Sequence, residues 1–504
     1  MIVQHIAVFI SDHGLGHLTR LAPTVNELYR KFPNAQFHII TNVNKFFISE
    51  RLQEIPREQI RLLNIKISVG LIEEENTVST CPFKTIEMWK QHWDQHYRCL
   101  YDDSIYEDNN GIYNNTTEQK PSNDDDDSDQ TNDERRNVSH HSSMIFAIEE
   151  FLQPYQIQLI VWDVPDVAPV MAKRLNEKYS REGESKWPIS IGISNWCWEW
   201  IYEHCMDHFP QDFPKDKILG HIHQRPVTFQ ELEKEKQLMV KQSRLLYSTL
   251  GKTDLFIQLP YPTDELPFKK DLTIVKPLDN SWPITETIKK AKFTKDQMKQ
   301  WIFSKSKIAS SSNTLDLSQI KVMMFSFGGL SFPSSTLIQE KEPTWSIPND
   351  WLVVVMCSSK IEGDTIPANV VNLTFLDLGN ECIDFARDLL LAVDVLVGKT
   401  SYGTVTETLF HQIPTMYLER YGMIEHGYTE RALKDNLGEE CVCQVEGDEV
   451  INALPSLFLK ASQLVENKKK RGLENCKDGR RVDLEFNGGQ KAADMICSFL
   501  ESNK

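Results

Sequence analysis

Two histidines flank a short glycine loop near the start of the chain. The loop, residues 11–17, reads Ser-Asp-His-Gly-Leu-Gly-His and follows the apolar run 6–10. Glycines at a strand-to-helix turn let backbone N–H groups approach a ligand closely, and a helix N-terminus favours an anion, most often a phosphate. We therefore expect Gly14 and Gly16 to contact a phosphate. His17 adds a side chain that can take up a proton near neutral pH. A tight turn between packed elements is the alternative interpretation.

The loop matches neither of two common nucleotide-binding motifs. Thr19 stands where a dinucleotide fingerprint requires its third glycine. No Gly-Lys-Ser/Thr follows the loop, as a Walker motif would require. The ligand class therefore has to come from other parts of the chain.

A second loop of this kind lies in the C-terminal half. Residues 392–407 read as a strand, a Gly/Ser/Thr-rich loop and the start of a helix. Backbone N–H groups and hydroxyls there could bind phosphate oxygens. Glu407, about one turn into the helix, could accept hydrogen bonds from a ribose diol. The alternative for Glu407 is that it is only a negative charge in the first turn of the helix. The alternative for Lys399 is that it is a solvated cation in the loop. The predicted donor site comprises Gly328, Gly329, Lys399, Thr400, Ser401, Gly403, Thr404 and Glu407.

Composition indicates an ordinary globular protein. The chain has 504 residues, 40% of them hydrophobic and 25% charged, enough for two or three domains. Its ten cysteines show no C-x-x-C spacing, so we expect reduced thiols and not a disulfide framework or a zinc site. We see no signal peptide and no apolar run long enough to span a bilayer, and expect a cytoplasmic protein.

A large part of the net charge of −17 comes from one segment of the chain. Residues 102–134 hold twelve Asp or Glu and one Lys, together with many Asn, Ser and Thr. Such a segment buries too little apolar surface to offset its ordering entropy, so we expect a disordered acidic insertion over 102–140. The remaining acidity argues against a nucleic-acid partner.

Strand and helix patterns alternate outside this insertion, which predicts two parallel sheets covered by helices. We expect an N-terminal Rossmann-like domain over 1–294, a polar linker over 295–320 and a C-terminal Rossmann-like domain over 321–504. Ligands of such sheets bind beyond the carboxyl ends of the strands, so the two domains should face each other across a cleft. The expected strands lie near 5–10, 36–41, 61–68, 157–163, 189–194, 254–258, 321–327, 352–357, 371–375, 394–397 and 414–418.

Several windows in order resemble the GT-B glycosyltransferases. The second half is similar to the C-terminal domains of family 28-type enzymes, and most of the chain resembles the glycosyltransferase-like N-terminal region of plant L-arabinokinases. The matching windows are 14–20, 162–169, 194–202, 258–260, 327–329, 394–407, 412–414, 425–431 and 487–489.

The resemblance implies a GT-B fold in which the C-terminal domain binds a nucleotide sugar, with UDP as the default, and the N-terminal domain binds the acceptor. It implies His17 as the base, Asp163 as the acid that orients it, and Asp166 as a reserve. Caps or structural contacts are the alternatives for these residues. Trp196 and Glu425 are possible sugar contacts, although Trp196 could equally be core.

The same resemblance implies that no metal cofactor is required. Because no kinase domain follows the region in this chain, we expect no kinase activity. We therefore expect a hexosyltransferase with an unknown acceptor. A nucleotide-sugar epimerase of the same fold, a phosphorylase and a non-catalytic sugar-nucleotide sensor are the alternatives, because fold alone does not establish the reaction.

Overall fold

The computed structural model describes most of the chain outside the acidic segment. Gly14, Gly328, Gly329 and the expected insertion 102–140 lie outside the described residues. The described residues are 3–11, 13, 15–72, 80–100, 144–183, 187–207, 215–216, 218–222, 225–262, 266–267, 273–310, 316–327, 347–357, 367–420, 422–447, 450, 454–472 and 484–503.

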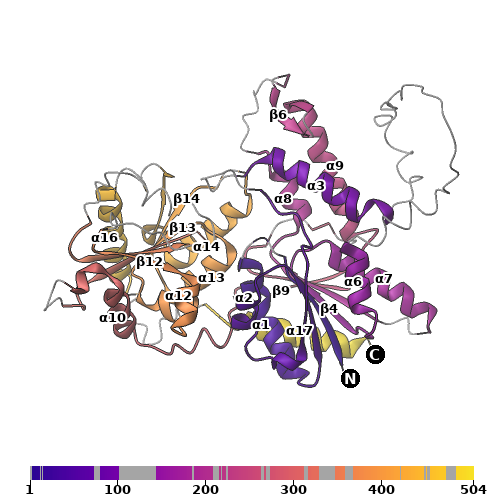
Figure 1. Cartoon of the computed structure of the whole chain (residues 1–504), viewed down its shortest axis with the longest axis horizontal. Coiled ribbons are helices and arrows are strands. Elements are labelled where there is room, and N and C mark those ends of the chain that lie inside the picture. Colours follow the sequence, from indigo (N-terminus) through magenta and orange to yellow (C-terminus); the bar gives the residue numbers. More distant parts are fainter. Residues whose placement is uncertain are drawn as a thin grey trace, which may run out of the picture.

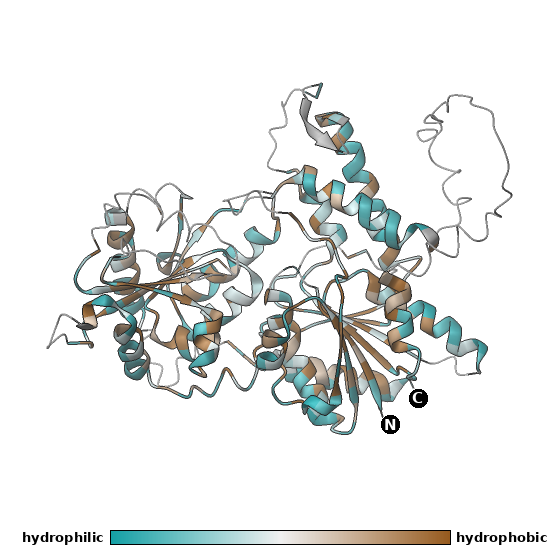
Figure 2. Cartoon of the chain, in the orientation of Figure 1, coloured by the Kyte–Doolittle hydropathy of each residue, from teal (hydrophilic) through white to brown (hydrophobic). Residues whose placement is uncertain are grey.

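The N-terminal half forms a seven-stranded parallel sheet with the order β3-β2-β1-β4-β5-β8-β9. Its inner strands are short, mostly buried and rich in apolar residues, as is typical of strands covered on both faces, and these residues are brown in Figure 2. The strands are β1 (His5–Phe9), β2 (Gln36–Thr41), β3 (Ile60–Asn64), β4 (Leu159–Trp162), β5 (Ile189–Ser194), β8 (Leu255–Gln258) and β9 (Ile274–Pro277).

Helices cover this sheet, and a smaller helical unit built from α3, α8 and α9 rises above it in Figure 1. The hairpin of β6 (Ile218–Ile222) and β7 (Arg225–Thr228) joins this unit. The helices are α1 (Leu15–Lys31), α2 (Lys45–Arg51), α3 (Pro82–His96), α6 (Met144–Leu152), α7 (Val167–Arg181), α8 (Trp198–His204) and α9 (Phe229–Tyr247).

The C-terminal half forms a six-stranded parallel sheet, β12-β11-β10-β13-β14-β15. Its strands are β10 (Lys321–Ser326), β11 (Trp351–Cys357), β12 (Val370–Thr374), β13 (Val395–Gly398), β14 (Thr415–Leu418) and β15 (Val442–Val445). Its helices are α10 (Lys295–Lys305), α12 (Phe375–Asn380), α13 (Tyr402–His411), α14 (Glu425–Leu437) and α16 (Leu454–Lys470), and the chain closes with α17 (Gly488–Ser502).

Each sheet changes direction of growth between two central strands. The change falls between β1 and β4 in the first sheet and between β10 and β13 in the second. Loops at such a switch point diverge to opposite faces and leave a crevice for a ligand. The histidine–glycine loop follows β1 and the Gly/Ser/Thr-rich loop follows β13, so both lie at these crevices.

The chain crosses between the domains twice, and the two crossings lie side by side. Ser281 pairs with Glu485 in an isolated bridge, and Trp282 donates its backbone N–H to the Glu485 carbonyl at 2.7 Å. After the second crossing, α17 packs on α1 of the first domain, where it appears yellow in Figure 1. The last helix therefore lies on the N-terminal sheet, although its residues follow the C-terminal sheet in sequence.

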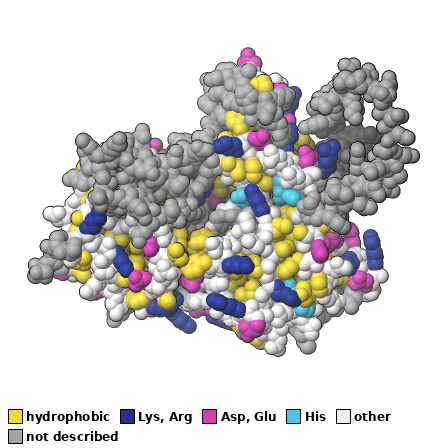
Figure 3. Space-filling model, viewed as in Figure 1, with side chains coloured by type: hydrophobic (Ala, Val, Ile, Leu, Met, Phe, Trp, Pro, Cys, Tyr) yellow, Lys and Arg dark blue, Asp and Glu magenta, His cyan; other side chains and the backbone are white. Residues whose placement is uncertain are grey.

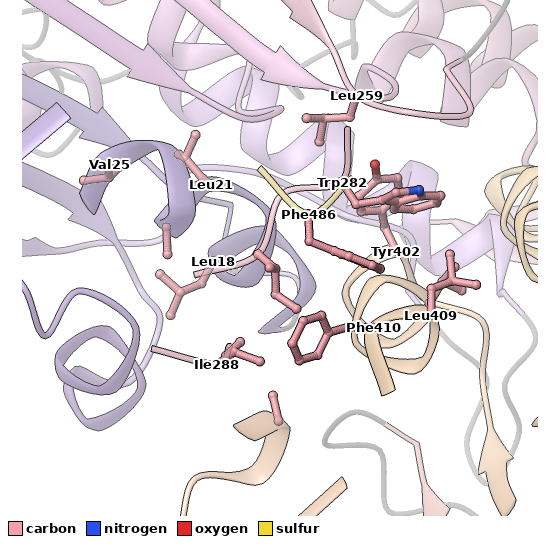
Figure 4. Close-up of a cluster of buried hydrophobic side chains, with 14 of the residues drawn as sticks. Leu18, Leu21, Val25, Leu259, Trp282, Ile288, Tyr402, Leu409, Phe410 and Phe486 are labelled. Carbon is pink, nitrogen blue, oxygen red and sulfur yellow. The ribbon is translucent and has the colours of Figure 1, made fainter. Parts of the chain in front are cut away.

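Apolar side chains from both domains form one continuous buried cluster. Figure 4 shows Leu18 and Leu21 of α1 on one side and Leu409 and Phe410 of α13 on the other, with Phe486 between them and Trp282 of the crossing segment beside Tyr402. Because burying apolar surface is the main stabilising term in association, this cluster holds the two domains together.

The segment expected as a linker, residues 295–320, contains a helix. Residues 295–305 form α10, which begins with a capping box in which Thr294 and Gln297 each bond the other's backbone N–H. Lys299 of α10 is buried against Asp394 of the C-terminal domain, 3.0 Å away. The polar composition there reflects capping and ion pairing on a packed helix.

Most expected strands are present within a residue or two. The strands β9 and β15 and the hairpin β6–β7 were not anticipated. Strand β9 is a four-residue edge strand with largely exposed side chains, so it lacks the apolar run of a buried strand. Among the described residues, no helix is long and apolar enough to cross a membrane.

Candidate active site

A cavity of about 500 Å³ lies between the two domains, at the carboxyl ends of both sheets. Its N-terminal wall includes His17, Arg20 and Trp196, and its opposite wall includes Gly403 and Glu407. On the face drawn in Figure 3, histidine side chains lie near the middle of the molecule with a Lys or Arg side chain between them. The cavity thus joins the loops that the sequence analysis singled out in each half.

His17 and Asp163 meet on the N-terminal wall. His17 lies in the first turn of α1, after β1, and Asp163 directly follows β4, which pairs with β1. The register that sets Phe9 beside Trp162 brings the two loops together. Nδ1 of His17 lies 2.5 Å from Oδ2 of Asp163. The 146 residues that separate them in sequence are bridged by this strand pairing.

The carboxylate of Asp163 is ionised in this setting. Complete burial would raise its pKa, but the His17 ring and the Arg20 guanidinium together hold that pKa below its ordinary value. The backbone N–H of Ser11 also donates to Oδ1 at 3.2 Å. An ionised carboxylate can only accept hydrogen bonds.

The tautomer of His17 follows from this. Nδ1 is approached both by Asp163 and by Nη2 of Arg20, each at 2.5 Å, but a ring nitrogen makes one in-plane hydrogen bond. We assign the proton to Nδ1, which donates to Asp163. The ionised carboxylate can only accept a hydrogen bond, and the Arg20 guanidinium can only donate one, so Asp163 is the partner that a protonated Nδ1 can bond. A neutral ring then carries its lone pair on Nε2, and His17 lines the cavity.

The reserve carboxylate lies elsewhere. Asp166 is buried and accepts a hydrogen bond from the Tyr97 hydroxyl at 2.8 Å. Burial raises the pKa of Asp166 to about 7, with the Tyr97 bond acting against that rise. Asp166 thus pairs with Tyr97, the residue that directly follows α3. Of the two aspartates, only Asp163 pairs with His17.

The N-terminal turns of α1 and α13 contact each other at the edge of the cavity. A Cβ placed on Gly403 would lie 3.2 Å from Cα of Gly16. A side chain at Gly403 would therefore crowd α1, whereas a Cβ on Gly16 would come only within 3.9 Å of the Gly403 nitrogen, so the glycine at 403 is the one that serves close approach. At Ser401, the residue before α13, no side-chain cap satisfies the first N–H groups of the helix. These groups and the helix dipole suit an anion at this end of the cavity.

Four polar residues, three of the β13–α13 loop and Thr404 in the first turn of α13, take different positions. Lys399, Ser401 and Thr404 line the cavity, and the hydroxyls of Ser401 and Thr404 lie 2.8 Å apart. Thr400 instead points to α14, where its hydroxyl lies 2.7 Å from Nδ1 of His426. Three of the four are therefore placed for phosphate contact, and Thr400 braces the loop.

Glu407 is buried on the cavity wall and reaches the other domain. Its Oε1 lies 3.3 Å from Nη2 of Arg51, at the end of α2. Arg51 also approaches Asp384 at 3.7 Å. Burial raises the pKa of Glu407 to about 7; Arg51 acts against this and Asp384 adds to it. Phe375 and Phe385, with ring centroids 5.5 Å apart, line the same part of the cavity, and stacking of a flat ring suits this wall.

Trp196 and Glu425 contact each other across the cleft. The Trp196 indole N–H donates to Oε1 of Glu425 at 2.7 Å, and the Asn195 side chain donates to the same oxygen at 3.3 Å. Trp198 stacks on Tyr202 one helical turn later, with an interplanar angle of 15°. Both tryptophans are nearly buried and yet line the cavity, so they are core and cavity wall at once.

The cavity residues Arg20, Arg51 and Arg420 were not proposed from the sequence as site residues, and neither was Asn195, which bonds Arg20. Arg20 and Asn195 stood inside recognised windows without a role, and Arg51 lies in a helix that carries no motif. Arg420 follows β14, is nearly buried and lines the cavity. Its position after a buried strand is the one sequence signal that could have found it. Over the described ranges, no group of three or more His, Cys, Asp or Glu side chains is arranged to hold a metal ion.

Two parallel-sheet domains face one cavity with their carboxyl ends, and the final helix returns to the first domain. The fold is GT-B. Solved structures similar to it include the glycotransferase of kitacinnamycin (13% identity, TM-score 0.47, 98% of this chain and 99% of that one). Another is Phytolacca americana UGT2 with UDP-2-fluoro-glucose and pterostilbene (12%, 0.46, 99% of each chain). A third is Medicago truncatula UGT71G1 with UDP-glucose (12%, 0.45, 98% of each chain).

One curated relative matches only part of this chain. The L-arabinokinase of Arabidopsis thaliana is 29% identical over 127 residues. That match covers 25% of this GT-B chain and spans only about a tenth of the relative's length. No family model matches the chain.

Proposed function

We propose that this protein is a glycosyltransferase that moves a hexosyl or related sugar from a nucleotide sugar, by default a UDP-sugar, to a hydroxyl acceptor. The observation that carries the proposal is the His17–Asp163 pair, which lies across one cavity from the uncapped N-terminus of α13. A base on one wall and an anion site on the other are the two groups that glycosyl transfer from a diphosphate needs.

His17 is the proposed base. Its Nε2 takes the proton of the acceptor hydroxyl while that oxygen attacks the anomeric carbon of the donor sugar. The bond from this carbon to the β-phosphate oxygen breaks, and the nucleoside diphosphate leaves with the electron pair. Asp163 holds the ring in the required tautomer and stabilises the imidazolium that forms. Attack opposite to the leaving group inverts the anomeric centre.

The negative charge that develops on the leaving diphosphate would be stabilised by the C-terminal wall of the cavity. The first-turn N–H groups of α13 and the side chains of Ser401 and Thr404 face it, and Lys399 and Arg420 bring positive charge to the same cavity. Charge developed in a site with such preorganised donors is stabilised more strongly than in water. We therefore propose that the reaction needs no metal cofactor.

Glu407 and Glu425 are the proposed contacts of the donor's hydroxyls. Glu407 lies beside the aromatic wall of Phe375 and Phe385, where its carboxylate can accept from a ribose diol while the base stacks. Oε1 of Glu425 already binds Trp196 and Asn195, so its Oε2 is the oxygen proposed for a sugar hydroxyl.

A two-stage experiment tests the proposal. The purified protein is first screened by thermal shift against UDP, GDP, ADP and TDP and their sugar conjugates, because a ligand that binds only the folded state raises the melting temperature. The sugar conjugate that binds is then incubated with a hydroxyl-acceptor library, and release of nucleoside diphosphate is measured. The His17→Ala variant, which should bind but not release, is the control.

The outcomes separate the alternatives. Release that depends on both acceptor and His17 supports a transferase. Binding without release, at any acceptor, would replace the transferase with a non-catalytic sensor. Interconversion of two nucleotide sugars without acceptor would replace it with an epimerase. No binding by any nucleotide would overturn the donor-site assignment itself.

A further inference from the structure

Arg20 lies where the two halves of the proposed reaction meet. It follows His17 by one turn of α1, and its side chain is only 2% exposed. Nη1 donates to Oδ1 of Asn195 at 2.6 Å and lies 3.9 Å from Oε1 of Glu425. Nη2 lies 3.4 Å from Oδ2 of Asp163. One guanidinium therefore stands between a carboxylate of each domain.

Aromatic rings of both domains enclose this cation. The guanidinium carbon lies 5.1 Å from the ring centre of Trp196 and 5.7 Å from that of Tyr402. Both distances are within the range of cation–π attraction. Among the described residues, Nε of Arg20 has no hydrogen-bond partner. A buried charge with an unsatisfied donor is costly for folding stability, which makes a purely structural role a poor account of its position.

We propose that Arg20 is a positioning residue for the transfer reaction: it holds Asp163 against His17 and, through Asn195, ties that pair to Glu425 on the opposite wall. This inference rests on the proposed glycosyltransferase function. The planar, forked guanidinium suits the role, because it reaches two partners at fixed angles, which a lysine ammonium does not. The base pair and the sugar-binding edge are then aligned by one rigid group.

The charge of Arg20 also acts on Asp163. After burial and His17, Arg20 is the next group that sets the pKa of Asp163, and it lowers it. The charged or titratable groups recorded near this carboxylate are His17 and Arg20 of α1 and the thiol of Cys197, whose pKa burial raises well above its ordinary value. The thiol stays neutral, so Arg20 is the cation recorded beside this carboxylate, and His17 donates a hydrogen bond to it. Removing Arg20 lets the pKa of Asp163 rise.

The test uses Arg20→Gln, Arg20→Lys and a matched control on the same helix, Arg30→Gln, whose side chain pairs with Glu27 and Glu54 at the surface. We expect Arg20→Gln to lower kcat about 100-fold and to leave UDP-glucose affinity within about threefold. The acid limb of the kcat/KM profile should move to higher pH, because without the Arg20 charge the pKa of Asp163 rises and its carboxylate is protonated at a higher pH. Arg20→Lys should recover at least tenfold of kcat, and Arg30→Gln should behave as wild type.

A second measurement does not depend on turnover. In ¹⁵N-histidine-labelled protein, with the His17 signal assigned from the His17→Ala variant, the wild type should show the Nδ1–H tautomer at neutral pH, and Arg20→Gln should show a mixture. Asn195→Ala, which breaks the link to Glu425 and leaves every charge in place, should lower kcat in the same direction by a smaller factor.

The two readouts keep the two proposals apart. A folded Arg20→Gln variant with unchanged kcat, pH profile and tautomer would overturn the role of Arg20 and leave the transferase proposal standing. A tautomer that depends on Arg20 in a protein that transfers no sugar would support the positioning role and overturn the transferase. If Arg20→Gln fails to fold, unchanged kcat in the Asn195→Ala variant overturns the inference.

Discussion

Replacing Glu407 with glutamine tests the donor site most directly. This carboxyl is buried on the cavity wall, and burial raises its pKa to about 7, with Arg51 acting against the rise and Asp384 adding to it. A ribose diol donates its hydrogen bonds to a carboxylate, so the proposed donor binds the ionised form. Donor affinity should therefore follow the ionisation of this one group.

The size of the effect comes from the titration. With a pKa of about 7, the ionised share of Glu407 falls from about nine-tenths at pH 8 to about one-tenth at pH 6. The dissociation constant of a donor that binds only the ionised form rises about tenfold over this interval, or about 1.4 kcal/mol. Glu407→Gln should weaken binding at pH 8 by about tenfold and make it independent of pH from 6 to 8.

Calorimetric titration with UDP-glucose at both pH values measures this. Both phosphates of that ligand are esterified, so the ligand itself does not titrate in the interval. Glu440→Gln, at the surface beside Arg471, is the matched control and should keep the wild-type pH slope. Equal pH slopes in wild type and Glu407→Gln would refute the reasoning, and equal affinities at pH 8 would remove Glu407 from the donor site.

The raised pKa of Glu407 also predicts how the free energy of unfolding depends on pH. Because folded Glu407 keeps its proton from pH 4.5, its ordinary pKa, up to about pH 7, the folded state binds more protons than the unfolded chain in that window. Stability is then lost as pH rises through the window, by about 3 kcal/mol. Glu407→Gln should remove this loss, and its melting temperature at pH 8 should exceed that of the wild type.

Three further substitutions test other parts of the site. His17→Ala should abolish transfer and leave nucleotide affinity within about tenfold, measured by the release assay and by titration. Asp163→Asn should lower kcat by about 10³- to 10⁴-fold with little change in the KM for donor, because the amide no longer fixes the Nδ1–H tautomer; a normal kcat would contradict the base assignment. Gly403→Val should separate α1 from α13, because a Cβ there already lies 3.2 Å from Gly16. Donor affinity measured by titration should fall, and unchanged affinity with full activity would show that close approach is not needed.

Much of this molecule could be predicted locally. Short apolar runs bounded by glycine loops marked most strands of both sheets, since a strand buried on two faces must be apolar throughout. Loops after β1, β4 and β13 could be assigned to one edge of their sheets, because parallel strands end together. The pairing of His17 with Asp163 is implied by the resemblance to GT-B enzymes, and in the structure Nδ1 of His17 lies 2.5 Å from Oδ2 of Asp163.

Contacts between the domains could not be predicted in this way. The pairs Arg20–Glu425 and Arg51–Glu407 join residues hundreds of positions apart, and no periodicity in either segment marks the partner. The return of α17 to α1 is of the same kind. Each depends on how two separately folded surfaces meet.

The sequence by itself determined the two parallel sheets and the loops at their carboxyl ends, because strand periodicity and glycine turns are properties of neighbouring residues. Only the tertiary structure decided which charged side chains form ion pairs across the cleft. Burial and ion pairing depend on distance in space, and these set the ionisation of Asp163 and Glu407.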